Sequence, residues 1–325
     1  MLSRAVFSAI AGCFLGLTLA TPGAVAQDYP NRAVRLIVTF APGGGSDLLG
    51  RATAELLGSR LGQPVVVENK PGAGGTIGVG LAAKANPDGY TLLWGASDTL
   101  TVTSSVKVSV PFAVPEDFAF IAQVTGFNYV IVINPKLPYK NLQELIAYAK
   151  DNPGKVRYGS SGTGSASHLV PELLAKEAGI KLTHVPYGGS GPANTAAMGG
   201  HIDLVFTSPQ VKNLTEAGQL RAIAQTGAGR DPGFADVPTL KESGFPSLVI
   251  PITWGLLAPA GTPEPVLVTL RAAAAEMMKD PATAERFRKL GYEPAYLPHD
   301  QFREFIVKDL EQWRGVAKSA NITIE

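Results

Sequence analysis

The chain has one cysteine, no marked charge imbalance and no long apolar segment beyond its first residues. Cys13 is the only cysteine among 325 residues, so we expect neither a structural disulfide nor thiol catalysis in the rest of the chain. Basic and acidic residues number 28 and 27, which does not indicate a surface for nucleic acid or anionic membranes. After the first residues, no segment reaches the roughly 20 apolar residues that span a bilayer.

The usual signatures of catalysis and nucleotide binding are also missing. The sequence contains neither a Gly-x-x-x-x-Gly-Lys phosphate loop nor a Gly-x-Ser-x-Gly nucleophile elbow. Its four histidines show no i, i+4 pairing and have no cysteine partner. We therefore expect no metal, no cofactor and no enzymatic activity.

The N-terminal residues are similar to a secretory signal. Arg4 precedes an apolar region, and Ala24-Val25-Ala26 forms a small-residue cleavage site. We expect residues 1–26 to be removed and the mature protein to be periplasmic. Ile10-Ala-Gly-Cys13 is similar to a lipoprotein processing box, so lipidation of Cys13 is the alternative.

Leu36 to Asp47 predicts a buried strand, a glycine loop and the start of a helix. Leu36 to Phe40 is an apolar run of strand length, the three glycines 43–45 follow Pro42, and Ser46 or Asp47 can cap a helix. Backbone N–H groups of such a loop, together with the positive end of the helix dipole, attract an anion. The alternative is that the glycines only form a tight turn.

Two further strands of this half end in comparable loops. The strand 63–69 leads into a loop with Ala73 and Gly74, and the strand 90–94 leads into a loop with Ser97 and Asp98. Alternating strands and helices predict an α/β fold with mixed, mostly parallel sheets, in which ligands bind beyond the carboxyl ends of the strands. There, the Asp98 carboxylate could accept a hydrogen bond from a ligand hydroxyl or ammonium group.

The same pattern returns later in the chain. The strand 156–158 is followed by Gly159–Ser167, a second loop of small polar residues, and by a helix starting near His168. Because about 300 residues exceed what one core usually serves, we predict two lobes. The first comprises residues 27–125 and 253–325, and the second residues 126–252.

None of the loops 41–47, 71–76, 95–99, 159–167 and 187–192 contains Lys or Arg. Neutral donors suit a carboxylate, and the missing bases favour binding over catalysis. Three side chains keep two interpretations each. His168 hydrogen-bonds a ligand or supports a helix end, Asp47 contacts a ligand or pairs with Arg51 four residues later, and Asp203 is a buried acceptor or a rim residue.

Several motifs together cover most of the chain. They are Pro42-Gly-Gly-Gly-Ser-Asp47, Glu68-Asn-Lys-Pro-Gly-Ala-Gly-Gly75, Asn86-Pro-Asp-Gly-Tyr90, Tyr158-Gly-Ser-Ser-Gly-Thr-Gly-Ser165, Val185-Pro-Tyr187 and Trp254-Gly-Leu-Leu-Ala-Pro259. In this order they resemble the Bug/TctC family, the periplasmic solute-binding receptors of tripartite tricarboxylate transporters.

The resemblance implies a two-lobed periplasmic-binding-protein fold of type II, with a cleft that closes on a small organic carboxylate. It implies a monomer that delivers the carboxylate to membrane transporter subunits. It also implies that the Gly43–Asp47 and Gly162–Ser165 loops grip one carboxylate from opposite lobes. The expected ligand-binding residues are Gly43, Gly44, Gly45, Ser46, Asp47, Ala73, Gly74, Ser97, Asp98, Ser161, Gly162, Thr163, Gly164, Ser165, His168, Tyr187 and Asp203.

Two positions differ from the common family pattern. Gly188-Gly189 follow Tyr187 where the family often has Lys or Arg, and Asp98 stands where a neutral residue is common. Both changes make the site less positive, so we expect a monocarboxylate, or a ligand with a hydroxyl or amino group, rather than a tricarboxylate. Two other functions stay open: a ligand-binding partner of a sensor domain, and an exported enzyme on the same fold.

Overall fold

The computed structural model describes residues 29–320 and 323, and its strands form two separate sheets. The six-stranded sheet has the order β11-β4-β10-β3-β1-β2, and we call this sheet with its helices the first lobe. Its strands are β1 (Val34–Val38), β2 (Val65–Asn69), β3 (Thr91–Ala96), β4 (Phe118–Asn128), β10 (Pro251–Pro259) and β11 (Pro294–Pro298). The five-stranded sheet of the second lobe has the order β7-β6-β8-β5-β9. Its strands are β5 (Val130–Ile133), β6 (Arg157–Ser160), β7 (Thr183–Pro186), β8 (Leu204–Thr207) and β9 (Arg221–Gln225).

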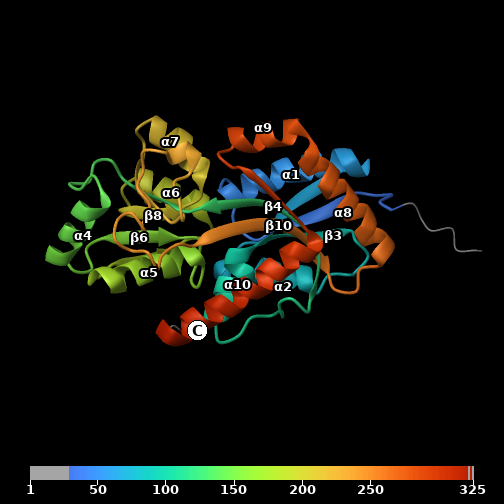
Figure 1. The fold of residues 1–325 in the computed structure, drawn as a ribbon, viewed down its shortest axis with the longest axis horizontal. Coiled ribbons are helices and arrows are strands. Elements are labelled where there is room, and N and C mark those ends of the chain that lie inside the picture. The colour runs from blue at the N-terminus through green and yellow to red at the C-terminus, as the bar shows by residue number, and fades with distance from the viewer. Residues whose placement is uncertain (1–28, 321–322, 324–325) are drawn as a thin grey trace, which may run out of the picture.

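Helices surround both sheets (Figure 1). The first lobe contains α1 (Gly45–Leu61), the short turn η1 (Ala73–Gly75), α2 (Thr76–Ala83), the π-helical turn η2 (Asp98–Thr103), α3 (Ser104–Val106), α8 (Glu264–Lys279), α9 (Pro281–Lys289) and α10 (His299–Ala320). The second lobe contains α4 (Leu142–Asp151), α5 (Ala166–Ala178), α6 (Ser190–Met198), η3 (Pro209–Val211), α7 (Lys212–Glu216) and η4 (Pro232–Phe234). In the described part of the chain, no helix combines the length and apolar character of a membrane span.

Both sheets mix parallel and antiparallel pairs. β1 pairs in parallel with β2 and β3, and β6 pairs in parallel with β7 and β8. The other pairs, among them β10 with β3 and β4, are antiparallel. The prediction of two mixed α/β sheets is confirmed, but parallel pairs are not the majority. In the first sheet β10 returns from the second lobe and inserts antiparallel between β3 and β4, and in the second sheet β5 runs antiparallel to β8 and β9.

Two long strands connect the lobes. β4 and β10 lie side by side through the middle of the molecule (Figure 1), paired from Asn128–Pro251 to Phe118–Pro259. Only Tyr129 separates β4 from β5, which belongs to the other sheet. β4 runs without a break across the predicted lobe boundary between Thr125 and Gly126, because β10 provides hydrogen-bond partners through Asn128. The residue boundaries of the lobes stay a prediction.

The predicted strand–loop–helix unit at the start of the chain is present as β1 and α1. Leu36 and Val38 of β1 pack in the core with Leu49 and Leu57 of α1, all completely buried. Leu48 of α1, in contrast, is 36% exposed.

No pattern in the sequence predicts β11, because Pro294 and Pro298 disfavour a strand. The structure tolerates these prolines because β11 lies at the edge of its sheet, where a missing N–H leaves no partner strand without a donor.

Candidate functional site

A cavity lies between the lobes, beyond the carboxyl ends of β1, β3, β6 and β8. Its lining consists of aromatic side chains, serines, one glycine and one carboxylate: Phe40, Gly44, Ser46, Asp98, Phe127, Tyr129, Ser161, Ser167, Ser190, Phe206, Ser208 and Trp254. The volume is about 30 Å³, enough for about two waters. An organic acid is larger, so its entry requires the lobes to separate.

The first glycine loop presents the N-terminus of α1 to this cavity. Gly44 is the N-cap residue, and no side chain caps this end of the helix. Ser46 is 5% exposed, and its hydroxyl, within the cavity lining, has no hydrogen-bond partner. A buried hydroxyl without a partner is costly in a folded protein. Of the buried hydroxyls without a partner on α1, those of Ser46 and Thr53, only that of Ser46 belongs to the cavity lining.

Asp47 supports the loop from behind and does not line the cavity. Its carboxylate accepts hydrogen bonds from Gly43 N–H (3.0 Å) and Asn69 Nδ2 (2.9 Å) and pairs with Arg51 at 2.9 Å. Burial alone would raise the pKa of Asp47, but Arg51, Gly43 and Asn69 outweigh it and hold the pKa below its ordinary value. Asp47 thus stays ionised and fixes the glycine loop, which agrees with the predicted helical ion pair.

The segment after β3 is helical, although the sequence predicted a loop from Gly95 to Thr99. β3 continues to Ala96, and all six residues of η2 are buried. The Ser97 hydroxyl accepts a hydrogen bond from Thr253 N–H (3.0 Å), so it holds β10 instead of facing the cavity. Asp98 is 2% exposed and lines the cavity. π-helical turns are frequent at functional sites.

The second-lobe loop contributes less to the cavity than predicted. Ser161 lines it, together with Ser167 from the first turn of α5, and their hydroxyls are 2.8 Å apart. Ser165 Oγ donates to Gly162 O (2.8 Å), which closes the loop on itself. Gly162, Thr163 and Gly164 are not among the lining residues. The predicted clamp of one carboxylate by Gly43–Asp47 and Gly162–Ser165 is therefore not the arrangement in this closed structure.

The tip of this loop packs instead on the turn that contains Ala73 and Gly74. A Cβ at Gly74 would lie 2.8 Å from Thr163 O, and one at Gly162 would lie 2.9 Å from Gly74 N. Gly74 also has a positive φ of 69°, so glycine is needed here for both conformation and space. These residues form a contact between the lobes rather than part of the cavity wall.

His168 supports the loop before α5, which agrees with the predicted role at a helix end rather than the role as a ligand contact. Its Nδ1 accepts a hydrogen bond from Gly164 N–H (3.1 Å), and its ring stacks on His184 with centroids 3.9 Å apart. His184 Nε2 lies 2.6 Å from Ser160 Oγ. This Ser–His pair was not predicted, but Ser160 is completely buried and does not line the cavity. Ser160 Oγ also accepts a hydrogen bond from Gly162 N–H (3.1 Å), so the pair supports the loop.

We expect His184 to make the protein less stable in acid. Burial, reinforced by His168, lowers the pKa of His184 from 6.5 to about 4. The folded protein therefore binds this proton more weakly than the unfolded chain, and the free energy of unfolding falls as the pH drops from 6.5 towards 4. Urea denaturation of wild type and His184→Gln at several pH values tests this, and the variant is expected to show a weaker acid dependence. Equal slopes for the two proteins would contradict it.

Four further predicted residues, Gly43, Gly45, Tyr187 and Asp203, are not among the residues that line the cavity. Tyr187 follows β7 and packs on the second-lobe core, and its N–H donates to Ser160 O (3.0 Å). Asp203 immediately precedes β8, at the end of the strand opposite the cavity. It pairs with Arg157 at 3.2 Å and accepts Arg157 N–H at 2.6 Å. Asp203 is thus a buried acceptor, and its assignment to the ligand site is corrected.

Comparison with known proteins identifies the family. Residues 49–322 match the family described as "Tripartite tricarboxylate transporter family receptor". BugT of Bordetella pertussis is 37% identical over 317 residues, which cover 96% of this chain and 97% of BugT. The chain belongs to this family. The resemblance found from the motifs is confirmed.

Solved structures confirm the fold of the receptor. The periplasmic binding protein BugD is 33% identical, with a TM-score of 0.87 over 91% of this chain and 100% of BugD. A protein of R. palustris solved with adipate is 30% identical, with a TM-score of 0.86 over 91% of this chain and 99% of that chain. The receptor is therefore a two-lobed periplasmic solute-binding protein.

Sequence reasoning missed most of the residues that line the cavity of the receptor. Phe40 follows β1 and Ser208 follows β8, so the rule that sites form at carboxyl strand ends could have found both. Ser190 opens α6 directly after a predicted glycine turn. Phe127 and Trp254 lie inside strands, where no local signal separates a cavity wall from ordinary core.

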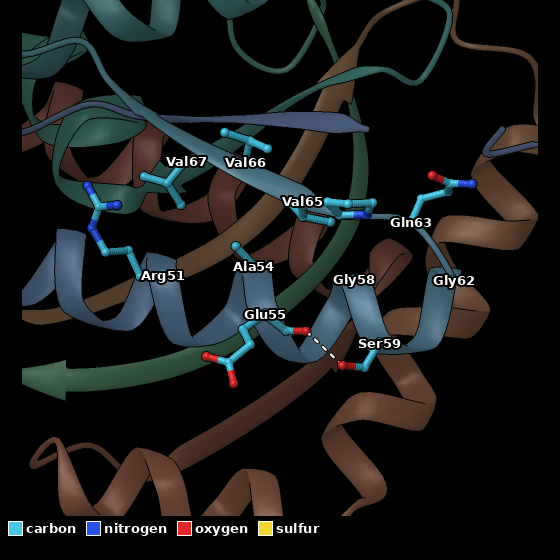
Figure 2. Close-up of a pocket in the computed structure, with 11 residues that line it drawn as sticks. Arg51, Ala54, Glu55, Gly58, Ser59, Gly62, Gln63, Val65, Val66 and Val67 are labelled. Atoms are coloured by element: carbon cyan, nitrogen blue, oxygen red, sulfur yellow. Dashed lines mark hydrogen bonds between the residues drawn. The ribbon is translucent and has the colours of Figure 1, made fainter. Parts of the chain in front are cut away.

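A larger hollow of about 750 Å³ lies on the first lobe, between α1 and β2. Figure 2 shows Arg51, Ala54, Gly58 and Val67 around it. Its charged groups already have partners, since Arg51 pairs with Asp47 and Glu55 pairs with Arg286.

Among the described residues, no group of three or more His, Cys, Asp and Glu side chains could hold a metal. The interlobe cavity remains the candidate site.

Proposed function

We propose that the receptor captures a small organic carboxylate in the interlobe cavity and, as a monomer in the periplasm, delivers it to membrane transporter subunits. The observation that carries this proposal is the partnerless, buried Ser46 hydroxyl at the uncapped N-terminus of α1. A carboxylate placed there would accept the hydroxyl proton and face the positive end of the helix.

A second helix supports the same end of the cavity from the other lobe. The N-terminus of α6 has no side-chain cap, and Ser190 in its first turn lines the cavity. The two lobes also meet here through the hydrogen bond from Ala41 N–H to Gly188 O (2.9 Å). A bound carboxylate would thus receive donors from both lobes and favour their closure.

The cavity favours binding over catalysis. Among its serines, Ser161 and Ser167 share a hydrogen bond and Ser208 donates to Gln210, and neither the cavity lining nor these hydrogen bonds include a histidine or lysine base. A nucleophile needs an adjacent base to react at neutral pH. The adipate bound to the R. palustris neighbour supports a carboxylate as the ligand class.

Carboxylates are expected to raise the melting temperature of the protein, and Ser46→Ala is expected to reduce that effect. A ligand at 100 times its dissociation constant adds about 2.7 kcal/mol to stability. Loss of a hydrogen bond to a charged group costs roughly 1.5–3 kcal/mol, so the variant should bind about tenfold or more weakly. A thermal-shift screen followed by isothermal titration calorimetry measures both effects.

Thr53→Val is the matched control. Thr53 also lies on α1, and its buried hydroxyl also has no partner, but it does not line the cavity. Both variants should fold at least as stably as the wild type, because each loses an unsatisfied hydroxyl. If sugars or cations stabilise the protein and no carboxylate does, the proposed function is wrong. Equal carboxylate affinities of Ser46→Ala and Thr53→Val would show that Ser46 does not bind the ligand.

A further inference from the structure

One anion-binding position between the lobes is already occupied by the protein itself. Asp98 extends from η2 of the first lobe to the N-terminus of α5 in the second. Its Oδ1 accepts Ala166 N–H at 2.7 Å, and its Oδ2 accepts the Tyr129 hydroxyl at 2.9 Å. α5 has no side-chain cap from its own N-cap residue, Ser165. The Asp98 carboxylate therefore stands where a ligand carboxylate at this helix end would bind.

This arrangement makes the two sides of the cavity chemically different. One side has the N-termini of α1 and α6 with Ser46 and Ser190, while the other has the ionisable Asp98. Phe127, Tyr129 and Trp254 add aromatic surface, and none of the lining residues is Lys or Arg. A ligand carboxylate can lie against the first side, but a second one in so small a cavity would face Asp98 without a cation to offset the repulsion.

We propose that Asp98 is a specificity-determining residue that restricts the receptor to monocarboxylates, by occupying the anion position at α5 and repelling a second carboxylate. This inference rests on the proposed carboxylate function and names its ligand class. The far end of the ligand would be apolar, or would carry a hydroxyl or amino group that donates to Asp98. Burial raises the pKa of Asp98 to about 6, against the opposing effects of Ala166 N–H and the Tyr129 hydroxyl, so the side chain is charged at neutral pH.

Ligand pairs of equal length but different charge test the proposal. Hexanoate against adipate, and 4-methylbenzoate against terephthalate, are titrated into the wild type, Asp98→Ser and Asp98→Asn at pH 7.5. The wild type is expected to prefer the monocarboxylate of a pair at least tenfold. Asp98→Ser frees the N–H of Ala166. It should lower the ratio of monocarboxylate affinity to dicarboxylate affinity at least tenfold. Asp98→Asn keeps the shape of the side chain and should narrow it as well.

Asp309→Asn is the matched control, because it removes the same charge. Asp309 is partly buried, whereas Asp98 is fully buried; like Asp98 it accepts a hydrogen bond from a side-chain hydroxyl, that of Thr101 (2.5 Å), but it does not line the cavity. Its ligand ratio should equal that of the wild type. Equal binding of both members of a pair by the wild type, or an unchanged ratio in both folded Asp98 variants, would overturn the inference while leaving carboxylate binding intact. If neither these acids nor any other carboxylate binds the wild type, the proposed function itself fails, and the inference with it.

Discussion

Gly191→Ala is expected to weaken carboxylate binding roughly 10- to 100-fold while both lobes stay folded. Gly191 lies in the first turn of α6, against the glycine loop of the other lobe. A Cβ at this position would lie 2.8 Å from Gly43 C and Gly44 N, and 3.0 Å from Pro42 O. These are backbone atoms and cannot move as a side chain can. Overpacking of this kind typically costs 1–3 kcal/mol, and separation of the lobes relieves it.

The loss of affinity follows because the ligand binds between closed lobes. The apparent dissociation constant is inversely proportional to the fraction of free protein that is closed, so it rises when that fraction falls. Calorimetric titration with a carboxylate identified by the thermal-shift screen measures this effect. Gly229→Ala is the control, since a Cβ there meets no atom within 4 Å. An unchanged affinity of Gly191→Ala would show that ligand binding does not need the contact between α6 and the 42–44 loop.

Trp254→Ala is expected to lower the free energy of unfolding by about 3–5 kcal/mol, the usual cost of removing a large buried aromatic side chain. Trp254 lies in β10 near the crossing between the lobes and is 4% exposed. Its ring is 4.5 Å from that of Phe127 and 5.3 Å from that of Tyr292, measured between centroids. The substitution would leave a large void next to the cavity, and the β-strands around it cannot collapse to fill that space.

Denaturation by guanidinium chloride, followed by circular dichroism, measures this loss. Trp254→Phe keeps an aromatic ring and should cost less than half as much. Val268→Ala, at a position that is 56% exposed, should be close to neutral. A loss below about 1 kcal/mol for Trp254→Ala would mean that the aromatic cluster is not a tightly packed part of the core.

The parts of the fold that depend on neighbouring residues were predictable from the sequence. Apolar runs of strand length and glycine loops before helices identified β1 with α1, and β6 with α5, because both signals act over a few residues. The continuous course of β4 through Gly126 was not predictable, because β10 pairs with it from far along the chain. The same holds for β11, where the position at the sheet edge makes two prolines acceptable.

The candidate site divides in the same way. Gly44, Ser46, Asp98 and Ser161 were predicted and line the cavity, because they follow strand ends that point into it. Asp47 and His168 were predicted in the alternative roles that the structure shows, since their partners lie four residues away, at Arg51 and Gly164. The aromatic walls were missed, because burial beside a cavity and burial in a core have the same pattern along a strand.

The sequence by itself determined the chemistry that the loops offer: neutral hydroxyls and backbone N–H groups, two carboxylates at positions 47 and 98, and no cation. Only the tertiary structure decided where each group faces. Asp98 and Ala166 are 68 residues apart in the chain, and the crossing strands bring them within 2.7 Å. Because α5 thereby receives its anion from within the protein, the donors that remain for a ligand are those of α1 and α6. That result depends on how the two lobes pack, which no local pattern encodes.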